Sequence, residues 1–252
     1  MLCPAATGRQ PWLSLFDGNA EHLDLTSGCW LLRGKLRKKL QPSEQEVEDM
    51  WAAQPPHREK LEMYGKPVEL PRLVQLYSAE PLTVRVLAGK EIHAQPLSKE
   101  TPGYLRRVLA GMPAEASYNS VLSNWYPSGN DYIGWHGDRE KQIDSDTAPI
   151  VSISLGAPRR FQVRHEASRR LVFDHLLEDG ECVVMGGAGF QQTYKHRVPK
   201  MVAKKDSDVK RRLNLTVRKY RPLADLRGAP RRLDGSRGGR GASESPPLCD
   251  LR

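Results

Sequence analysis

Three residues of this chain have metal-binding side chains at a spacing that allows them to share one ion. His136 and Asp138 lie two positions apart at the end of a predicted strand, 132–136, and strand alternation places both on one side. Taken alone, this pair also fits a surface turn. His196, which follows four further predicted strands, is the candidate third ligand. Two histidines and one carboxylate form the facial triad that leaves half of an Fe(II) coordination shell open.

A second group of reactive side chains lies on a predicted strand near the end of the sequence. Residues 212–218 read RLNLTVR, so polar residues share one face and aliphatic residues the other. Such a strand, on its own, also fits an exposed sheet edge. Arg212 and Arg218 carry planar guanidiniums suited to bidentate binding of carboxylates, as a dicarboxylate such as 2-oxoglutarate requires. Asn124 and Tyr126 alternate in the same way on an earlier strand and would complete a pocket with an amide and a phenol.

A mainly β domain is predicted to position these residues. Turns rich in Gly, Pro, Asn and Asp separate seven short strand-like segments. Many short strands with such turns between them indicate a sandwich, barrel or jelly roll. The predicted strands cover residues 121–126, 132–136, 150–155, 161–164, 171–173, 181–185 and 213–220.

Two short amphipathic helices are predicted on the N-terminal side of the strands. Ser43 and Glu46 have the spacing of a capping box, and the helical pattern after them stops before Pro55. Thr101, as the cap, and the proline that follows it begin the second helix, which ends at Gly111. Both helices are expected to pack against the β domain.

Composition favours a polyanionic partner. The formal net charge is +9, and a basic protein gains affinity for polyanions through counterion release. Basic clusters lie at 33–39, at 204–212 and in the C-terminal tail, although each alone also fits a solvated face.

No apolar run approaches the roughly 18 residues of a membrane span. Residues 1–12 lack the pattern of a secretory signal, and the four widely spaced cysteines fit free thiols in a reducing compartment. We therefore expect an intracellular monomer away from membranes, with nucleus and cytoplasm not distinguished.

The order of these motifs resembles the AlkB family of Fe(II)/2-oxoglutarate dioxygenases. The similarity covers about residues 119–220 and extends more weakly to Pro71-Arg72-Leu73 and Tyr77, which resemble the segment before the family's nucleotide-recognition lid. The resemblance implies a double-stranded β-helix (jelly roll) with N-terminal helices and a lid. The motifs that carry it are Asn124-Trp125-Tyr126, His136-Gly137-Asp138, the strand at 149–156, His196 and the strand at 212–218.

The resemblance also implies roles for individual residues. His136, Asp138 and His196 would hold Fe(II). Arg212 would clamp the distal carboxylate of 2-oxoglutarate, and Arg218 would lie nearer its iron-bound end. The full set expected around 2-oxoglutarate is Asn124, Tyr126, Arg212, Asn214, Thr216 and Arg218.

Fewer residues indicate how a substrate base would be bound. Glu140 falls where family members often carry an acidic residue beside the base, and it fits a loop carboxylate equally well. Tyr77 and Trp135 are candidates for stacking on a base or for core aromatics. The lid of the family usually contains an aromatic-rich Tyr-x-Tyr-Ser-Gly stretch, but residues 82–87 of this chain read LTVRVL. The choice of base therefore stays open.

The implied activity is oxidative removal of N-alkyl groups, such as methyl, from bases of DNA or RNA, with 2-oxoglutarate and O₂ as co-substrates. A base that is buried in a duplex must be flipped out, or the strand must be single. Two other functions remain possible on the sequence alone: an AlkB-like hydroxylase or demethylase of protein or lipid, and a non-catalytic RNA-binding protein that uses its Arg-Gly tail.

These expectations divide the chain into three parts. The segment after about residue 223 loses its periodic apolar positions and becomes rich in Arg and Gly, which is typical of disorder. We predict an N-terminal extension with a short helix at 1–70, a dioxygenase domain at 71–222 with a lid (71–118) and a β core (119–222), and a disordered Arg/Gly-rich tail at 223–252.

Overall fold

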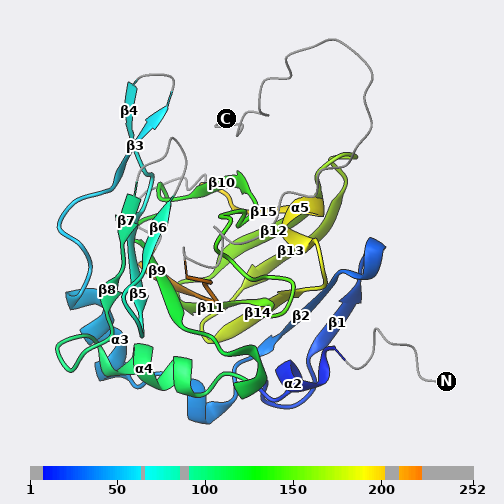
Figure 1. Cartoon of the computed structure of the whole chain (residues 1–252), viewed down its shortest axis with the longest axis horizontal. Coiled ribbons are helices and arrows are strands. Elements are labelled where there is room, and N and C mark those ends of the chain that lie inside the picture. Colours follow the sequence, from blue (N-terminus) through cyan, green and yellow to red (C-terminus); the bar gives the residue numbers. More distant parts are fainter. Residues whose placement is uncertain (1–7, 64–65, 86–90, 202–209, 223–252) are drawn as a thin grey trace.

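Two facing β-sheets form the body of the molecule (Figure 1). The computed structural model describes residues 8–63, 66–85, 91–201 and 210–222, so the predicted tail lies outside the described residues. The larger sheet has the order β1 (Glu21–Asp24), β2 (Trp30–Lys35), β14 (Glu181–Gly186), β11 (Ile150–Gly156), β16 (Arg212–Arg218), β9 (Ser120–Tyr126), β5 (Leu73–Ser78) and β8 (Gln95–Pro96). The smaller sheet has the order β10 (Ile133–His136), β15 (Tyr194–Val198), β12 (Arg159–His165) and β13 (Leu171–Leu177).

The chain passes back and forth between the two sheets from β9 to β16. Strands β9, β11, β14 and β16 belong to the larger sheet, and β10, β12, β13 and β15 belong to the smaller one. This arrangement is a double-stranded β-helix, and it confirms the predicted fold class. Each of the seven predicted strand segments overlaps an observed strand, whereas β15 and the strands before β9 were not predicted.

Two hairpins and several short helices complete the described fold. One hairpin pairs β3 (Lys60–Met63) with β4 (Lys66–Glu69), and the other pairs β6 (Thr83–Arg85) with β7 (Glu91–His93). The helices are α2 (Gln10–Leu13), α3 (Glu44–Ala52), α4 (Gly103–Ala110) and α5 (Phe190–Thr193), with 3-10 turns η1 (Thr26–Gly28), η2 (Lys38–Leu40) and η4 (Ala114–Ala116). In the part of the chain that the structure covers, no helix has the length and apolar character needed to cross a bilayer.

The N-terminal segment contributes directly to the larger sheet. Strand β2 pairs with β14, and β1 pairs with β2. Leu31 and Leu32 on β2 are each 1% exposed and point into opposite faces of the sheet, as alternation requires. Residues 1–70, expected to form an extension with one helix, therefore supply two strands of the sheet.

Helices α3 and α4 cover the outer face of the larger sheet. The predicted capping box at Ser43 and Glu46 is present and begins α3. Helix α4 ends at Gly111 as predicted, but its N-cap residue is Pro102 and not Thr101. The hydroxyl of Thr101 is instead engaged with the backbone of Ser98, so it is not available to cap the helix.

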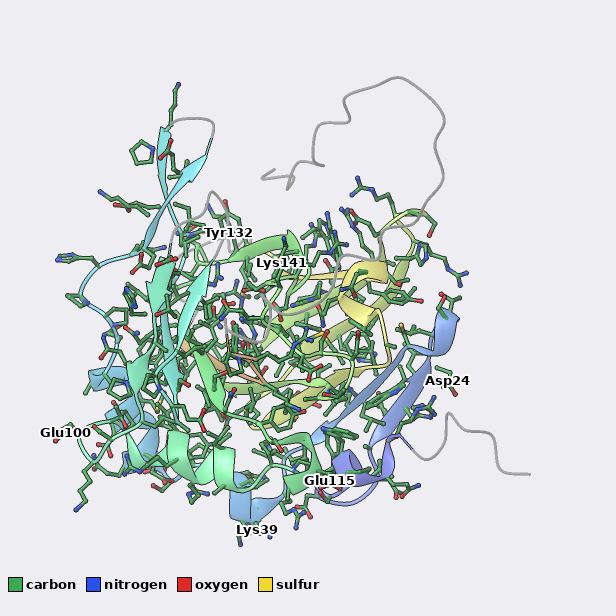
Figure 2. All side chains as sticks on the ribbon, in the orientation of Figure 1. Asp24, Lys39, Glu100, Glu115, Tyr132 and Lys141 are labelled. Atoms are coloured by element: carbon green, nitrogen blue, oxygen red, sulfur yellow. The ribbon has the colours of Figure 1, made fainter. Side chains whose placement is uncertain are left out.

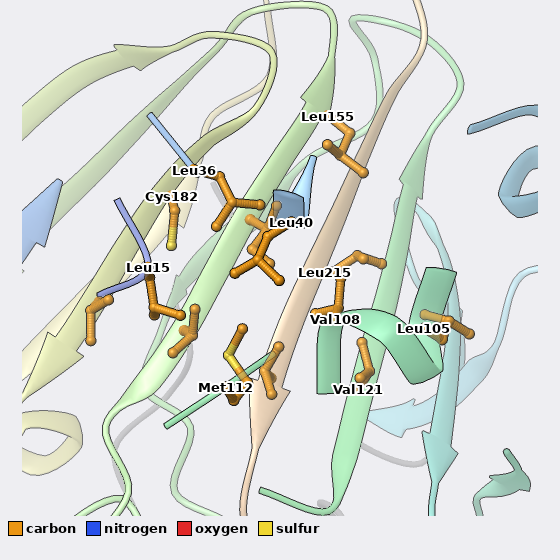
Figure 3. Packing of buried hydrophobic residues seen from close by; sticks show 14 of the residues in the cluster. Leu15, Leu36, Leu40, Leu105, Val108, Met112, Val121, Leu155, Cys182 and Leu215 are labelled. Carbon is orange, nitrogen blue, oxygen red and sulfur yellow. The ribbon is translucent and has the colours of Figure 1, made fainter. Parts of the chain in front are cut away.

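Strand β16 separates two hydrophobic clusters and is buried on both faces. Its aliphatic residues pack with α3 and α4 in the cluster of Figure 3, where Leu215 and Val108 lie close to each other. The second cluster fills part of the space between the two sheets and includes Phe161 and Met185. Charged residues such as Lys39 and Glu115 lie on the outside of the molecule (Figure 2). Strand β16 is thus a central strand, paired with β11 and β9, and not a sheet edge.

A prediction about stability follows from the position of Leu215, which is fully buried between β16 and the helices. Leu215→Ala should lower the free energy of unfolding by about 2–5 kcal/mol, because it removes buried methyl groups and leaves a cavity. Chemical denaturation measures the change. Leu13→Ala, at a leucine that is 38% exposed, should change it by less than about 0.5 kcal/mol. Equal effects of the two substitutions would contradict this description of the core.

Candidate active site

A cavity of about 1180 Å³ is lined by both sheets and by the two hairpins. Its walls include side chains from β9, β11 and β16 on one side and from β10, β12 and β15 on the other. Most of the residues predicted from the sequence to form a site line this one cavity. They are Asn124, Tyr126, His136, Asp138, Glu140, His196, Arg212, Asn214, Thr216 and Arg218.

The three candidate metal ligands meet where the smaller sheet ends. Strands β10 and β15 pair so that His136 lies opposite His196, and Asp138 follows directly after β10. The two imidazole rings have centroids 4.2 Å apart, and one ligand atom from each of the three residues lies within 4.8 Å of the others. Sheet pairing therefore brings together residues that are about 60 positions apart in sequence.

Both histidines have the protonation state that a metal ligand needs. Nδ1 of His136 lies 2.9 Å from the carbonyl oxygen of Gly134. Because a carbonyl can only accept a hydrogen bond, Nδ1 carries the proton and Nε2 keeps its lone pair. Burial lowers the pKa of His136, and burial together with the nearby His136 lowers the pKa of His196 to about 3. Both rings are therefore neutral at neutral pH.

Asp138 is held as an ionised carboxylate. Its side chain is 4% exposed, and Oδ1 accepts a hydrogen bond from Nη2 of Arg218 at 2.7 Å. Burial alone would raise its pKa, but Arg218, His196 and His136 together outweigh burial, so the pKa of Asp138 is lowered. The backbone N–H of Asp138 donates to Oε1 of Gln191 at 3.0 Å. These contacts leave Oδ2 free for another ligand.

The polar atoms left without partners in this cluster fit a bound metal ion. Oδ2 of Asp138 and Nδ1 of His196 are buried and have no hydrogen-bond partner among the described residues. Leaving such groups buried and unpaired is costly, so an unmet interaction is expected to be supplied by a ligand. A set of two imidazoles and one carboxylate suits Fe(II) and leaves coordination positions open.

Arg212 is a candidate anion site in the same cavity. Its side chain is 1% exposed, and its Nη2 donates to Ser154 Oγ at 3.0 Å. The guanidinium carbon lies 4.9 Å from the centre of the Tyr126 ring. Nε and Nη1 are buried without a hydrogen-bond partner, and no acidic side chain in the described part of the chain forms an ion pair with Arg212. A buried guanidinium without a counterion is unfavourable, so this site fits a carboxylate from outside the protein.

The amides on the neighbouring strands are held within the cavity wall. Asn214 donates to Ser152 Oγ and to the carbonyl oxygen of Ile153, each at 2.9 Å, and accepts from Thr216 at 3.1 Å. Asn124 lies opposite Asn214 in the sheet and accepts a hydrogen bond from another residue of the wall. These contacts use both donors of Asn214 and hold its side chain in place in the cavity wall; its predicted contact with 2-oxoglutarate stays a prediction.

Several polar residues in the cavity wall or directly behind it were not assigned from the sequence. Nε of Arg72 donates to Oδ1 of Asn124 at 2.8 Å, and Arg72 is 8% exposed. Ser152 and Ser154 occupy the polar positions of β11, a strand that reads from sequence mainly as an apolar run. Gln191 lies on the four-residue helix α5, which is too short to leave a periodic pattern.

Glu140 lies on the cavity wall close to the buried cation. Its Oε1 is 3.6 Å from Nη1 of Arg218, which also donates to the hydroxyl of Tyr220 at 3.2 Å. Burial raises the pKa of Glu140 in spite of the nearby Arg218. Its predicted contact with substrate stays a prediction.

The two aromatic candidates for base stacking do not line the cavity. Tyr77 is 4% exposed and belongs to the cluster under the helices. Arg72, just before β5, and Val74 and Leu76 on β5 line the cavity, whereas Tyr77 packs in the core under the helices, so it is not placed to contact a base in this cavity. Trp135 is half-buried, and the guanidiniums of Arg164 and Arg197 each lie 4.4 Å from its ring centre.

Comparison with known proteins identifies the family. Residues 28–218 match the model of the 2OG-Fe(II) oxygenase superfamily. The chain belongs to this superfamily. The family name implies Fe(II) and 2-oxoglutarate, and the cluster and the anion site described above contain suitable residues for both.

Relatives within this superfamily are AlkB homologues, which confirms the resemblance found in the sequence. Alpha-ketoglutarate-dependent dioxygenase alkB homolog 3 of Rattus norvegicus is 35% identical over 45% of this chain and 39% of its own length. The Homo sapiens protein of the same name is 30% identical over 64% of this chain and 54% of its own length. DNA oxidative demethylase ALKBH2 of Bos taurus is 32% identical over 65% of this chain and 58% of its own length. The chain thus spans about 39–58% of the length of these relatives. Among solved structures, that of OsALKBH1 is 17% identical, with a TM-score of 0.48 over 79% of this chain and 100% of the other.

A prediction about metal binding follows from the triad. His136→Ala removes a ligand from a cluster with three protein donors. The affinity of this variant for Ni(II), a redox-inert substitute for Fe(II), should fall more than about 100-fold. Loss of a residue that only supports a metal ligand lowers metal affinity by roughly 10- to 100-fold, and loss of the ligand itself should cost more. Isothermal titration calorimetry measures the affinity. His57→Ala, at an exposed histidine outside the cavity, should bind Ni(II) as the unmodified protein does. Equal affinities for the two variants would contradict the assignment.

Proposed function

We propose that this oxygenase removes N-alkyl groups, such as methyl, from bases of DNA or RNA, and that it consumes Fe(II)-bound 2-oxoglutarate and O₂ in doing so. The observation that carries the proposal is the presence, in one cavity, of a metal triad with unpaired ligand atoms and a buried arginine without a counterion. A metal and a dicarboxylate together would satisfy these groups.

Separate residues of the chain would bind the metal and the co-substrate. His136, Asp138 and His196 would hold Fe(II), which, with its co-substrates bound, supplies the oxidant that hydroxylates the alkyl carbon as 2-oxoglutarate becomes succinate and CO₂. Arg212 would bind the distal carboxylate through its free Nε and Nη1 atoms. Arg218 keeps Asp138 ionised and oriented through their 2.7 Å contact.

Alkylated nucleic acid is the substrate class that the remaining features favour. The net charge of +9 suits a polyanion, and relatives bear the name DNA oxidative demethylase. The cavity is somewhat larger than a typical ligand site, which leaves room for a nucleobase beside the co-substrate. Glu140, on the cavity wall after the metal ligands, would offer a carboxyl group to the edge of a base. The base would have to be flipped out or come from a single strand.

We also propose that the protein acts as a monomer inside the cell. Every residue of the triad and of the anion site comes from one chain, so the site is complete without a partner subunit. The predicted lid (71–118) and β core (119–222) both contribute walls to the cavity, which supports their assignment to one dioxygenase domain.

The substrate assignment is tested by turnover. The protein is supplied with Fe(II), ascorbate and 2-oxoglutarate and offered single- and double-stranded DNA and RNA oligonucleotides with defined N-methyl bases. We expect oligonucleotide products lighter by one methylene unit, together with succinate. A methylated peptide and a lipid serve as alternative substrates. Turnover of either one without turnover of any oligonucleotide would contradict the proposed substrate class, and absence of succinate with every substrate would contradict the enzyme assignment.

A prediction about co-substrate binding concerns Arg212. Arg212→Lys keeps the positive charge but loses the planar fork, so the KM for 2-oxoglutarate should rise by about 10-fold, as for a lost charge-assisted hydrogen bond of about 1.4 kcal/mol. The neighbouring Arg211 is 47% exposed and pairs with Glu48, so Arg211→Lys is the matched control and should leave the KM unchanged. Initial rates of succinate formation give the KM. An unchanged KM in Arg212→Lys would mean that 2-oxoglutarate binds elsewhere.

A further inference from the structure

The turn that carries two of the metal ligands is tied to helix α5 by three hydrogen bonds. Oε1 of Gln191 accepts from the backbone N–H of Asp138 at 3.0 Å. In the other direction, Nε of Arg139 donates to the carbonyl oxygen of Gln191 and its Nη2 to that of Gln192, each at 2.8 Å. The turn and the helix therefore hold each other through both side-chain and backbone groups.

The contact between turn and helix is close enough to require glycine. A Cβ atom on Gly137 would lie 2.4 Å from the carbonyl oxygen of Gln191, a backbone atom that cannot rotate away. Gly137 is the residue between the two metal ligands His136 and Asp138. The absence of a side chain at this position is thus what allows α5 to approach the metal turn.

Helix α5 is itself fixed to the rest of the protein. Phe190 is 1% exposed and its ring centre lies 5.2 Å from that of Tyr194. The hydroxyl of Tyr194 is hydrogen bonded to the side chain of Thr26 at 2.7 Å and accepts from the backbone N–H of the same residue at 3.1 Å. Gly189, at the start of α5, donates to Asp146 at 3.0 Å. Because the helix is anchored in this way, it can act as a fixed support for the metal turn.

The side chain of Gln191 is poorly suited to a purely structural role. It is fully buried, and its Nε2 has no hydrogen-bond partner among the described residues. A buried amide with one half unpaired costs stability, whereas an apolar side chain of similar shape would not. The amide oxygen must face Asp138, since a backbone N–H can only donate. What Gln191 provides is an acceptor at the backbone of a metal ligand.

We infer that Gln191 is a positioning residue that fixes Asp138 for metal binding, an inference that rests on the proposed iron site. Two contacts then determine where the carboxylate lies: Gln191 holds its backbone, and Arg218 holds Oδ1. Oδ2 is the atom that remains for the metal. Supporting residues of this kind typically change metal affinity by about 10- to 100-fold when they are removed.

The test compares metal affinity with folding stability in the full-length protein. Gln191→Met keeps the length of the side chain but removes the acceptor. We expect its Ni(II) dissociation constant, measured by isothermal titration calorimetry, to rise by about 10-fold or more, while the melting temperature without metal stays close to that of the unmodified protein. Gln192→Met, at the exposed neighbouring glutamine, is the matched control and should bind Ni(II) normally.

A second variant approaches the same contact from the other side. Gly137→Ala should push α5 away from the turn and also weaken Ni(II) binding, so the inference can be tested even if Gln191→Met does not fold. Unchanged Ni(II) affinity in both variants would overturn the role of Gln191, and so would a lower melting temperature with unchanged affinity. Absence of Ni(II) binding by the unmodified protein would instead overturn the proposed metal site, and the inference with it.

Discussion

The burial of β16 on both faces is the constraint on which the rest of the site depends. Because the strand lies between β11 and β9, alternation sends Leu213, Leu215 and Val217 toward the helices and the polar residues into the cavity. Two guanidiniums are thereby removed from water. Such charges are stable in a protein only if they are paired or hydrogen bonded, so the cavity around them must supply anions.

The two arginines meet this requirement in different ways, and the difference organises the cavity. Arg218 has its counterion within the chain, since its Nη2 is paired with Asp138 and its Nη1 lies near Glu140. In the described part of the chain, Arg212 contacts the hydroxyl of Ser154 and the side chain of Tyr126 but has no acidic partner, and its Nε and Nη1 lack a hydrogen-bond partner. Arg218 is therefore paired within the protein, whereas Arg212 remains able to bind an external carboxylate, as we propose. The two arginines are six residues apart on one strand, so the proposed metal site and the proposed carboxylate site are held at a fixed separation.

The parts of the site that could be predicted from sequence are those with a local pattern. The strict alternation of 212–218 and the spacing of His136 and Asp138 are visible without any knowledge of the fold, and the structure brings these residues together in one cavity. The strand β15 that carries His196 was missed because its five residues mix apolar and basic side chains, and its place is determined by pairing with β10 and β12. Gln191 depends on a contact between segments 53 residues apart, which leaves no local signal.

Two differences between the structure and the sequence-based expectations have equally specific causes. Tyr77 was assigned to substrate binding because it precedes the predicted lid. In the structure its side chain lies on the face of β5 that packs in the core under the helices. Residues 1–70 were expected to form an extension because their predicted helix was the strongest pattern there. The run Trp30-Leu31-Leu32 is short and has no alternation, yet it enters the sheet because both of its faces are covered. Local sequence patterns thus predicted the candidate site residues, whereas the segments that hold those residues in place are determined by non-local packing.

The central claim is that the unpaired donors of Arg212 and the triad bind one 2-oxoglutarate molecule between them. A crystal structure of the protein grown anaerobically with Mn(II) and 2-oxoglutarate tests it most directly. The account predicts one metal ion bound by His136, Asp138 and His196, and a distal carboxylate within hydrogen-bonding distance of Nε and Nη1 of Arg212. Metal or 2-oxoglutarate bound at other residues, with Arg212 still unpaired, would contradict it.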